Sequence, residues 1–362
     1  IERNVRELRS KLKSNCELMA VVKADGYGHD AKLVSDYAIK GGASHLGVAT
    51  LKEGILLRTS GIKVPILILG NLHTKRDLII CFKNDLMPTI SSLRECLLCN
   101  NIGKYFGLKF SLHLKVDTGM SRLGFELNKF VQQFEKIKSF ENISIKGLYS
   151  HLSSADENNA LDPKSSTQIQ RQKFQKLLEQ IDFDENHSTK IHLANSAGML
   201  INKNFHFDMV RVGLSIYGYN PLMIKEKKWL LEPAFFLKAK VSFIKIIDKG
   251  VAVSYGGKYV SQRKTKLAIL SIGYADGIHR NLSGKINVIY NNKLYSQVGS
   301  ITMDQMMVDI TDSNEIKIGT TMILLGSNGT KTISPVDWAR DSNTIPWEIL
   351  CSFKNRLPRI QV

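Results

Sequence analysis

The stretch Leu18-Met-Ala-Val-Val-Lys-Ala-Asp-Gly-Tyr-Gly-His29 joins an apolar, β-type run to a lysine and a glycine-rich turn. It is the first of eight apolar runs that alternate with amphipathic helical stretches up to about residue 220. The runs cover residues 18–22, 45–49, 65–69, 87–90, 110–116, 145–151, 190–194 and 209–214. This alternation predicts an α/β fold, a (β/α)8 TIM barrel over residues 1–224. The active site of such a barrel lies at the carboxyl ends of its strands.

The pattern changes after Pro221. Closely spaced strand-like runs follow at 267–272, 286–290 and 295–298, and the Asn291-Asn292 pair before the last run is typical of a tight turn. These features predict a second, mainly β domain over residues 225–362.

The composition is that of a globular protein with excess positive charge. Of 362 residues 43% are apolar, and the formal net charge is +17. The lysines are dispersed without interleaved aromatic residues, so a nucleic-acid function has little support, and a host with basic proteins or an anionic membrane surface explains the charge better. No apolar stretch approaches the ~20 residues that span a bilayer. Five scattered cysteines favour free thiols in a reducing compartment, so we expect a cytoplasmic protein without a metal site.

The first residues of the chain are amphipathic. Ile1, Val5, Leu8 and Leu12 recur at helical spacing, with no capping residue before them. We expect the sequence to begin inside a helix and further residues to precede it in the full protein.

Lys23 stands where the first barrel strand ends. A lysine that is desolvated there has a lowered pKa, and its neutral amine condenses with an aldehyde. A lysine that extends its ammonium group to solvent is the alternative interpretation, and for an isolated lysine it is the better one.

The fifth run carries a second lysine of interest. In residues 110–117 apolar and polar residues alternate, so Lys115 and its polar neighbours share one strand face. If that face points into the barrel, Lys115 is buried and must be paired or modified. The next loop brings Arg122 to the active-site end, where a guanidinium suits a substrate carboxylate, although a surface arginine is the simpler interpretation.

Glycines follow the seventh and eighth runs and recur in the second domain. Ser196 and Gly213 lie in the loops that form the phosphate site of many barrels, although a glycine at a strand end can serve only a turn. Tyr255 and Tyr274 each stand beside glycines, a pattern that is typical of hairpin turns.

Together these residues resemble the alanine racemase family over nearly the whole chain. Eight segments occur in the family's order, which makes the resemblance specific. They are Val22-Lys-Ala-Asp-Gly-Tyr-Gly-His29, Lys115-Val-Asp-Thr-Gly-Met-Ser-Arg-Leu-Gly124, Leu148-Tyr-Ser-His151, Ala194-Asn-Ser196, Val210-Arg-Val-Gly213, Val253-Ser-Tyr-Gly256, Gly273-Tyr-Ala-Asp-Gly277 and Met303-Asp-Gln305.

The resemblance implies a pyridoxal 5'-phosphate enzyme that works with two bases. Lys23 would hold the cofactor covalently, and Tyr255 would approach the opposite face from the other subunit of a homodimer. One base removes the Cα proton and the other returns a proton from the far side. His151 would support the hydrogen bonds of the tyrosine. Arg211 would face the pyridine nitrogen, where a group that keeps its proton weakens the electron sink and discourages transamination.

The resemblance also implies the binding residues. The cofactor phosphate would be held by Tyr27, Ser196 and the backbone of Gly213 and Leu214. Arg122, the backbone of Met303 and Tyr274 would bind the substrate. Lys115 matches a lysine that is carbamylated in some members, which is sensible chemistry because a buried neutral amine can take up carbon dioxide. An enzyme of this kind would supply D-amino acids for peptidoglycan precursors.

Two residues depart from the family pattern. Asn355 stands where many alanine racemases have a tyrosine, and its smaller amide could admit the hydroxymethyl group of serine. In this it resembles the serine racemases of vancomycin resistance, whose racemase domain follows a membrane-embedded region. A tether to the cytoplasmic face of the membrane would fit the charge. Ordinary variation in an alanine racemase explains Asn355 nearly as well. Ser300 replaces an arginine found near the entrance in some members, although Asp156 and Arg280 match other entrance residues.

Two alternatives use the same cofactor. A decarboxylase of basic amino acids would need an acidic pocket and would leave Tyr255 without a role. A non-enzymatic carrier of pyridoxal phosphate would have a single barrel, and the second domain of ~140 residues counts against it.

Overall fold

The computed structural model describes residues 1–182, 189–222, 229–354 and 356–361. The chain divides into two compact units. The first comprises Ile1–Gly26 and Asp30–Glu232, and the second comprises Tyr27–His29 and Pro233–Val362. The predicted domain boundary at 224/225 lies outside the described residues.

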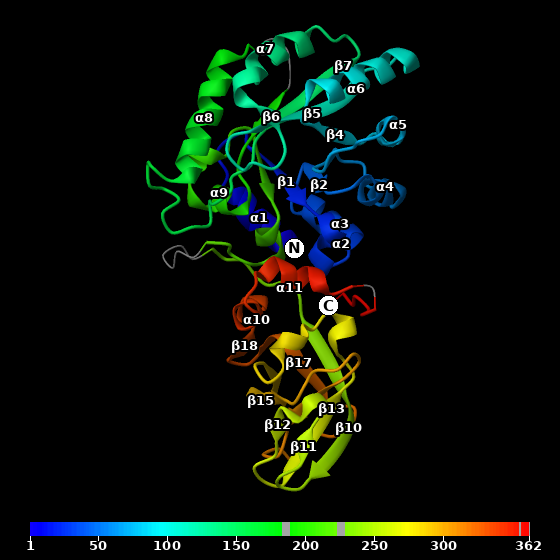
Figure 1. Cartoon of the computed structure of the whole chain (residues 1–362), viewed down its shortest axis with the longest axis vertical. Helices are drawn as coiled ribbons and strands as arrows, with labels where there is room; N and C mark the ends of the chain where they lie inside the picture. The colour runs from blue at the N-terminus through cyan, green and yellow to red at the C-terminus, as the bar shows by residue number, and fades with distance from the viewer. Residues whose placement is uncertain (183–188, 223–228, 355, 362) are drawn as a thin grey trace. The chain divides into compact units, whose positions relative to one another are not determined.

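The first unit is a closed barrel of parallel strands (Figure 1). Its strands are β1 (Glu17–Val21), β2 (His45–Val48), β3 (Ile66–Ile68), β4 (Met87–Ile90), β5 (Phe110–Asp117), β7 (Ile143–Tyr149), β8 (Lys190–His192) and β9 (Met209–Val212). The spatial order is β4-β3-β2-β1-β9-β8-β7-β5, and pairing of β4 with β5 closes the ring. The short β6 (Phe125–Glu126) adds to β5. The predicted barrel is therefore confirmed, and each apolar run overlaps one of these strands.

Helices follow the strands, and most of them begin at a side-chain cap. The main ones are α3 (Ala31–Lys40), α4 (Leu51–Thr59), α5 (Lys75–Lys83), α6 (Leu93–Phe106), α7 (Leu127–Lys138), α8 (Ser166–Gln180) and α9 (Ser196–Ile201). Thr50, Thr74 and Ser92 each accept a hydrogen bond from the backbone three residues on. Caps of this kind stabilise a helix by about 1 kcal/mol each, so they fix where the helices of the barrel begin.

The chain opens with the predicted amphipathic helix, α1 (Glu2–Ser10). Its apolar face buries Val5 and Leu8 completely. Asn4 is also buried, which the hydrophobic pattern did not predict. Its amide donates to the carbonyls of Ile216 (3.0 Å) and Glu232 (2.8 Å) and accepts from the Glu232 N–H, so it fastens α1 to the end of the barrel unit.

The second unit is an antiparallel β structure, as predicted. Its strands are β10 (Leu237–Ile247), β13 (Thr265–Leu270), β16 (Met306–Asp309), β15 (Lys293–Val298), β14 (Asn287–Tyr290), β17 (Thr321–Asn328) and β18 (Lys331–Ile333), given in spatial order. Pairing of β10 with β17 closes this sheet as well. At the β14–β15 hairpin Asn291 and Asn292 have φ of 47° and 58°, the left-handed conformation that a type I′ turn requires.

Smaller elements complete the second unit. A separate antiparallel ribbon consists of β11 (Ala252–Val253) and β12 (Tyr259–Val260). Two helices, α10 (Pro335–Ser342) and α11 (Pro346–Ser352), begin with proline in the first turn and were not predicted. Trp338 of α10 and Phe353 after α11 are buried in the core of the unit, so these helices are part of its packing.

Candidate active site

Lys23 directly follows the apolar run of β1, at the carboxyl end of the barrel. It begins α2 (Lys23–Gly28), and this turn is left-handed, because residues 24–28 have φ values of 52°, 54°, 60°, 50° and 78°. A left-handed turn costs roughly 1–2 kcal/mol for each residue other than glycine. Hydrogen bonds hold it: the N–H of Ala24 donates to Glu53 (2.7 Å), and the N–H of Ala31 donates to Asp25 (2.9 Å). Strain that neighbours hold in this way is typical of functional sites.

Lys115 is buried in the barrel, which is the case that the alternation in β5 left open. The residue is 5% exposed, and its ammonium lies 5.5 Å from the centre of the Tyr149 ring. Burial, with the positive charges of Arg211 and Arg122 nearby, lowers the pKa of Lys115 to about 8. A substantial fraction of this amine is therefore neutral near pH 8, the form that carbamylation requires.

Arg211 is the centre of the hydrogen-bond network inside the barrel. Its Nη1 donates to His192 Nδ1 (2.9 Å), and its Nη2 lies 3.1 Å from His151 Nδ1. Nη2 also donates to the carbonyls of Ser150 (2.7 Å) and Leu193 (3.0 Å). Burial lowers the pKa of Arg211 to about 10, so the guanidinium still keeps its proton at neutral pH.

The two histidines beside Arg211 are held neutral. Burial, followed by the charge of Arg211, lowers the pKa of both His151 and His192 well below the usual range. His192 is stacked on Tyr149 with ring centres 4.6 Å apart, and the Tyr149 hydroxyl shares a hydrogen bond of 2.7 Å with Thr89. His151 and Arg211 were predicted from the sequence, whereas His192 was not. Its signal was a histidine in a buried strand next to the loop of Ser196.

Two of the predicted phosphate-binding groups lie together. The backbone N–H of Gly213 donates to Ser196 Oγ over 3.0 Å, at the carboxyl ends of β9 and β8. Leu214 follows in a buried 3-10 turn. A hydroxyl and backbone N–H groups are the donors that a phosphate takes at such barrel ends, so these residues fit the group. Tyr27 is buried and belongs to the second unit.

Tyr255 is 70% exposed and is the first residue of η3 (Tyr255–Gly257). Its backbone is held by a pair of reciprocal hydrogen bonds. Ser254 Oγ donates to the Ser300 carbonyl (2.7 Å), and Ser300 Oγ donates to the Tyr255 carbonyl (2.8 Å). Ser300, which the sequence analysis associated with the entrance, is itself buried. The sequence therefore did not reveal that Ser300 holds the loop of Tyr255.

Tyr274 and Met303, two predicted substrate-binding residues, are neighbours in the second unit. Tyr274 begins η4 (Tyr274–Asp276), where its N–H donates to the Thr302 carbonyl (2.9 Å) and the next N–H donates to the Met303 carbonyl (3.0 Å). A Cβ at Gly273 would lie 2.3 Å from the Thr302 carbonyl oxygen, so this close approach requires glycine.

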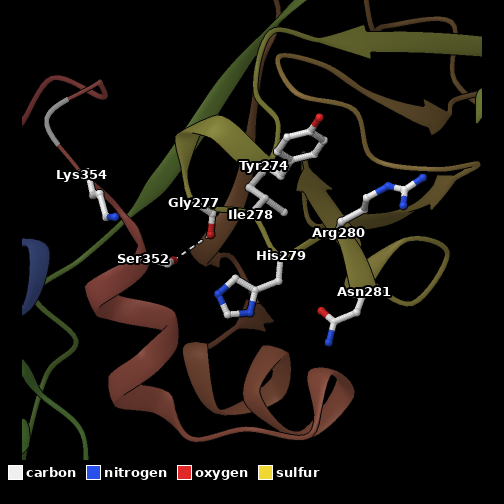
Figure 2. A pocket seen from close by; sticks show the side chains of 8 residues that line it. All are labelled: Tyr274, Gly277, Ile278, His279, Arg280, Asn281, Ser352 and Lys354. Carbon is white, nitrogen blue, oxygen red and sulfur yellow. Dashed lines mark hydrogen bonds between the residues drawn. The ribbon is translucent and has the colours of Figure 1, made fainter.

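A cavity of about 500 Å³ lies beside Tyr274 in the second unit (Figure 2). Ser352 Oγ donates to the Gly277 carbonyl (2.7 Å) at its edge. The cavity is lined by Tyr274, Gly277, Ile278, His279, Arg280, Asn281, Ser352 and Lys354. Asn355, on which the serine hypothesis rests, lies outside the described residues.

The remaining features of the sequence fall outside this site. Cys96 and Cys99 are both buried on α6, and burial raises the pKa of each thiol. No helix among the described residues is long and apolar enough to cross a membrane.

The barrel carries a lysine on a strained turn after β1 and a protonated arginine between neutral histidines, and a separate antiparallel β unit follows it. These features are those of a two-domain barrel enzyme of the pyridoxal-phosphate type. Two family models cover the chain: the alanine racemase N-terminal domain matches residues 1–221, and the C-terminal domain matches residues 234–361. The chain belongs to the alanine racemase family. Its cofactor is pyridoxal 5'-phosphate.

Curated relatives are similar to this chain over its full length. An alanine racemase of Prochlorococcus marinus is 49% identical over 362 residues, covering 100% of this chain and 94% of the relative. An alanine racemase of Nostoc sp. is 41% identical over 367 residues, covering 100% and 93%.

Solved structures agree as well. The alanine racemase of Clostridium difficile 630 superimposes with a TM-score of 0.90 at 33% identity, covering 98% of this chain and 90% of that one. The alanine racemase of Bartonella henselae with covalently bound pyridoxal phosphate has a TM-score of 0.88 at 30% identity, covering 100% and 98%. Family membership decides against the carrier and the decarboxylase.

Proposed function

We propose that this enzyme interconverts L- and D-alanine with pyridoxal phosphate, by two bases on opposite faces of the cofactor. The observation that carries the proposal is the environment of Arg211, a buried guanidinium that holds its proton between two neutral histidines. An arginine facing the pyridine nitrogen has no proton to spare for it, which favours return of a proton to Cα over transamination. The curated relatives named as alanine racemases support the same substrate.

In the proposed reaction, separate residues transfer the proton and hold the cofactor. The bound cofactor supplies an electron sink for the bond that breaks at the substrate Cα. Lys23 Nζ takes or gives the proton on one face, and the hydroxyl of Tyr255 from the second subunit of a homodimer does so on the other. Ser196, Gly213, Leu214 and Tyr27 hold the phosphate.

Arg122 binds the substrate carboxylate, together with the backbone of Met303 and with Tyr274. His151 supports the hydrogen bonds of the catalytic tyrosine. A carbamate on Lys115 would face Arg122 as an anion and orient its guanidinium. The charge effect of Arg122 on the pKa of Lys115 supports their closeness. Electron density beyond the Lys115 amine in a crystal structure tests this modification, and a bare amine rejects it.

The reaction is tested by following both products of racemisation. In deuterated water the enzyme should convert L-alanine into D-alanine and label both enantiomers at Cα. Lys23→Ala should abolish the exchange and the visible absorption of the covalently bound cofactor. Retention of that absorption would overturn the assignment of Lys23. Exchange of L-alanine without any D-alanine would overturn the two-base proposal.

Serine is a second candidate substrate, and it rests on Asn355 alone. A smaller, hydrogen-bonding residue at this position enlarges the pocket for a hydroxymethyl group. The ratio of Cα exchange for L-serine and L-alanine, measured before and after Asn355→Tyr, tests it. An unchanged ratio rejects the role of Asn355. The link to vancomycin resistance and to a membrane tether depends on the same residue and on the net charge.

Supply of D-alanine for peptidoglycan in the cytoplasm is the biological role that we propose with this activity. All five cysteines are free thiols, four of them buried, which supports a reducing compartment. Growth of a D-alanine-requiring bacterial strain after expression of the enzyme tests this role, and expression of Lys23→Ala is the control.

A further inference from the structure

A second cavity, of about 320 Å³, lies at the opposite end of the barrel strands from Lys23. His45 and Met87 in its lining are the first residues of β2 and β4, and Lys190 is the first residue of β8. The cavity therefore opens at the amino-terminal ends of the strands, whereas the proposed catalytic residues of the barrel stand at the carboxyl ends. All of its lining belongs to the first unit.

The lining of this cavity is strongly basic. It contains Arg58, Lys63, Lys146 and Lys190, with Asp85 as the acidic residue. The Asp85 side chain is 96% exposed and lies 3.5 Å from Arg58, so its charge is largely screened by water. Lys190 pairs with Glu17 at 2.6 Å. Among the described residues no acidic side chain pairs with Lys63 or Lys146, which leaves an excess of positive charge.

One residue of the lining, His113, also carries a buried ring nitrogen without a hydrogen-bond partner. His113 is 1% exposed, and its Nε2 has no hydrogen-bond partner in the described structure. Arginine can only donate, so His192 Nδ1 accepts from Arg211 and His192 keeps its proton on Nε2. That proton is donated to His113 Nδ1 over 3.0 Å. The proton of His113 is therefore on Nε2, where it is free for an acceptor.

The chain of donors gives this N–H more strength than an isolated imidazole has. It runs from the Arg211 cation through His192 to His113, and successive hydrogen bonds in a low-dielectric interior polarise one another. Burial, with the charges of His45 and Arg211, lowers the pKa of His113 to about 3, so the ring stays neutral and in this tautomer.

The local backbone is shaped around these groups. β7 has a bulge relative to β5, because Leu112 pairs with Ile145 and His113 pairs with Gly147. Lys146 is the extra residue, and a bulge is a means of redirecting a side chain. A Cβ at Gly147 would lie 2.3 Å from His113 Nδ1, so the glycine makes room for the imidazole.

We propose that this cavity binds a small phosphate-type dianion, either inorganic phosphate or a phosphate monoester. Lys63, Lys146 and Arg58 supply the charge, and the Nε2–H of His113 donates a hydrogen bond. The cavity volume suits a ligand of this size.

Calorimetric titration of the holoenzyme with inorganic phosphate, at low ionic strength and pH 7.5, tests the proposal. The cofactor then occupies the phosphate site near Ser196, so the titration reports on the second cavity. We expect saturable binding of one phosphate per subunit. Lys146→Gln and Lys63→Gln should each weaken binding at least fivefold. Lys136→Gln, which removes an exposed charge from α7, should leave it within twofold.

A parallel titration with glucose 6-phosphate shows whether the cavity takes the free ion or the monoester. Absence of saturable binding of both ligands would overturn the proposal. Equal affinity in the wild type and in both lining variants would do the same, since Lys63 is exposed and its replacement leaves the fold intact.

Discussion

The hydroxyl of Ser300 occupies a buried position from which it holds the main chain of Tyr255. Ser254 returns the contact through the Ser300 carbonyl, so two hydrogen bonds fix the loop that carries an exposed phenol. A proton carrier must keep within hydrogen-bond reach of Cα, and a loop that moves by about 1 Å loses rate.

Replacement of Ser300 should therefore change turnover more than binding. We expect Ser300→Ala to lower kcat for L-alanine roughly tenfold with little change in KM, and to lower the unfolding free energy by about 1 kcal/mol. Steady-state kinetics with urea unfolding measures both. Ser327→Ala, at an exposed position of β17, is the control. An unaltered kcat in Ser300→Ala would show that Tyr255 does not need this support.

At the scale of single residues, the sequence predicted the positions that depend on the alternation of a strand or on the end of a strand. The alternation in β5 placed Lys115 on one face with its polar neighbours, and Lys23 and Arg211 lie near strand ends as expected. The roles of His192, His113 and Ser300 were not predicted, because they depend on partners far away in the chain. His113 and His192, for example, are 79 residues apart.

Among the elements, the left-handed turn α2 is the one whose geometry the sequence did not predict. Gly26 and Gly28 fit its positive φ. Ala24, Asp25 and Tyr27 have no intrinsic preference for the left-handed conformation strong enough to predict the turn. The barrel strands were predictable because each is a short apolar run between polar stretches. The helices α10 and α11 were not predictable, because the closely spaced strand-like runs before them indicated a mainly β domain.

Substitution of Gly28 separates backbone strain from crowding. Its φ is +78°, and a Cβ there would lie 2.5 Å from the Leu350 carbonyl oxygen. Gly61 has φ of +90° with open space around it. We expect Gly61→Ala to cost about 1 kcal/mol of unfolding free energy and Gly28→Ala about 3 kcal/mol or more. Urea denaturation of the two holoenzymes measures this, and equal losses would mean that the turn relaxes without cost.

The buried histidines of the barrel interior also make the free energy of unfolding depend on pH. His113, His151 and His192 have folded-state pKa values far below the usual value near 6.5. As the pH falls below 6.5, these histidines take up protons in the unfolded chain but not in the folded protein. Their contribution to the free energy of unfolding is therefore complete above pH 6.5 and is lost as the pH falls towards the folded-state pKa values. Each should remove about 1.4 kcal/mol of unfolding free energy per pH unit below 6, about 4 kcal/mol for the three.

Urea unfolding at pH 7.5, 6.0 and 5.0 checks this slope. His73→Gln, at an exposed position, should leave it unchanged, whereas His192→Gln should reduce it by about a third, in line with one histidine of three. A slope below about 1.4 kcal/mol per pH unit in the wild type would contradict the burial of neutral histidines.

For the whole molecule, the proposed mechanism requires two subunits. Lys23 and Tyr255 would come from different chains, so an active site exists only in a dimer. Mixing Lys23→Ala with Tyr255→Phe, each inactive alone, produces heterodimers with one intact site and one doubly altered site. After random exchange we expect about a quarter of wild-type activity. No recovery, with exchange verified by mass, would mean that both bases belong to one chain.

The whole-molecule architecture was the most predictable level. Eight strand and helix units followed by closely spaced strands leave few arrangements, and the barrel with a β domain is the common one. How subunits combine was not predictable from periodicity, because an exposed tyrosine in a turn has the same local signal whether it faces solvent or a partner. That expectation came from the family resemblance.

The close approach of Gly147 to His113 has a consequence for engineering. Alanine at 147 alone would force the imidazole out of place, and a smaller residue at 113 alone would leave a void and would leave the Nε2–H of His192 without its acceptor. Replacing both together should cost less than the sum of the two single changes. Libraries that randomise the interior of this barrel should therefore vary positions 113 and 147 as a pair, since one-at-a-time scanning would mark both as immutable.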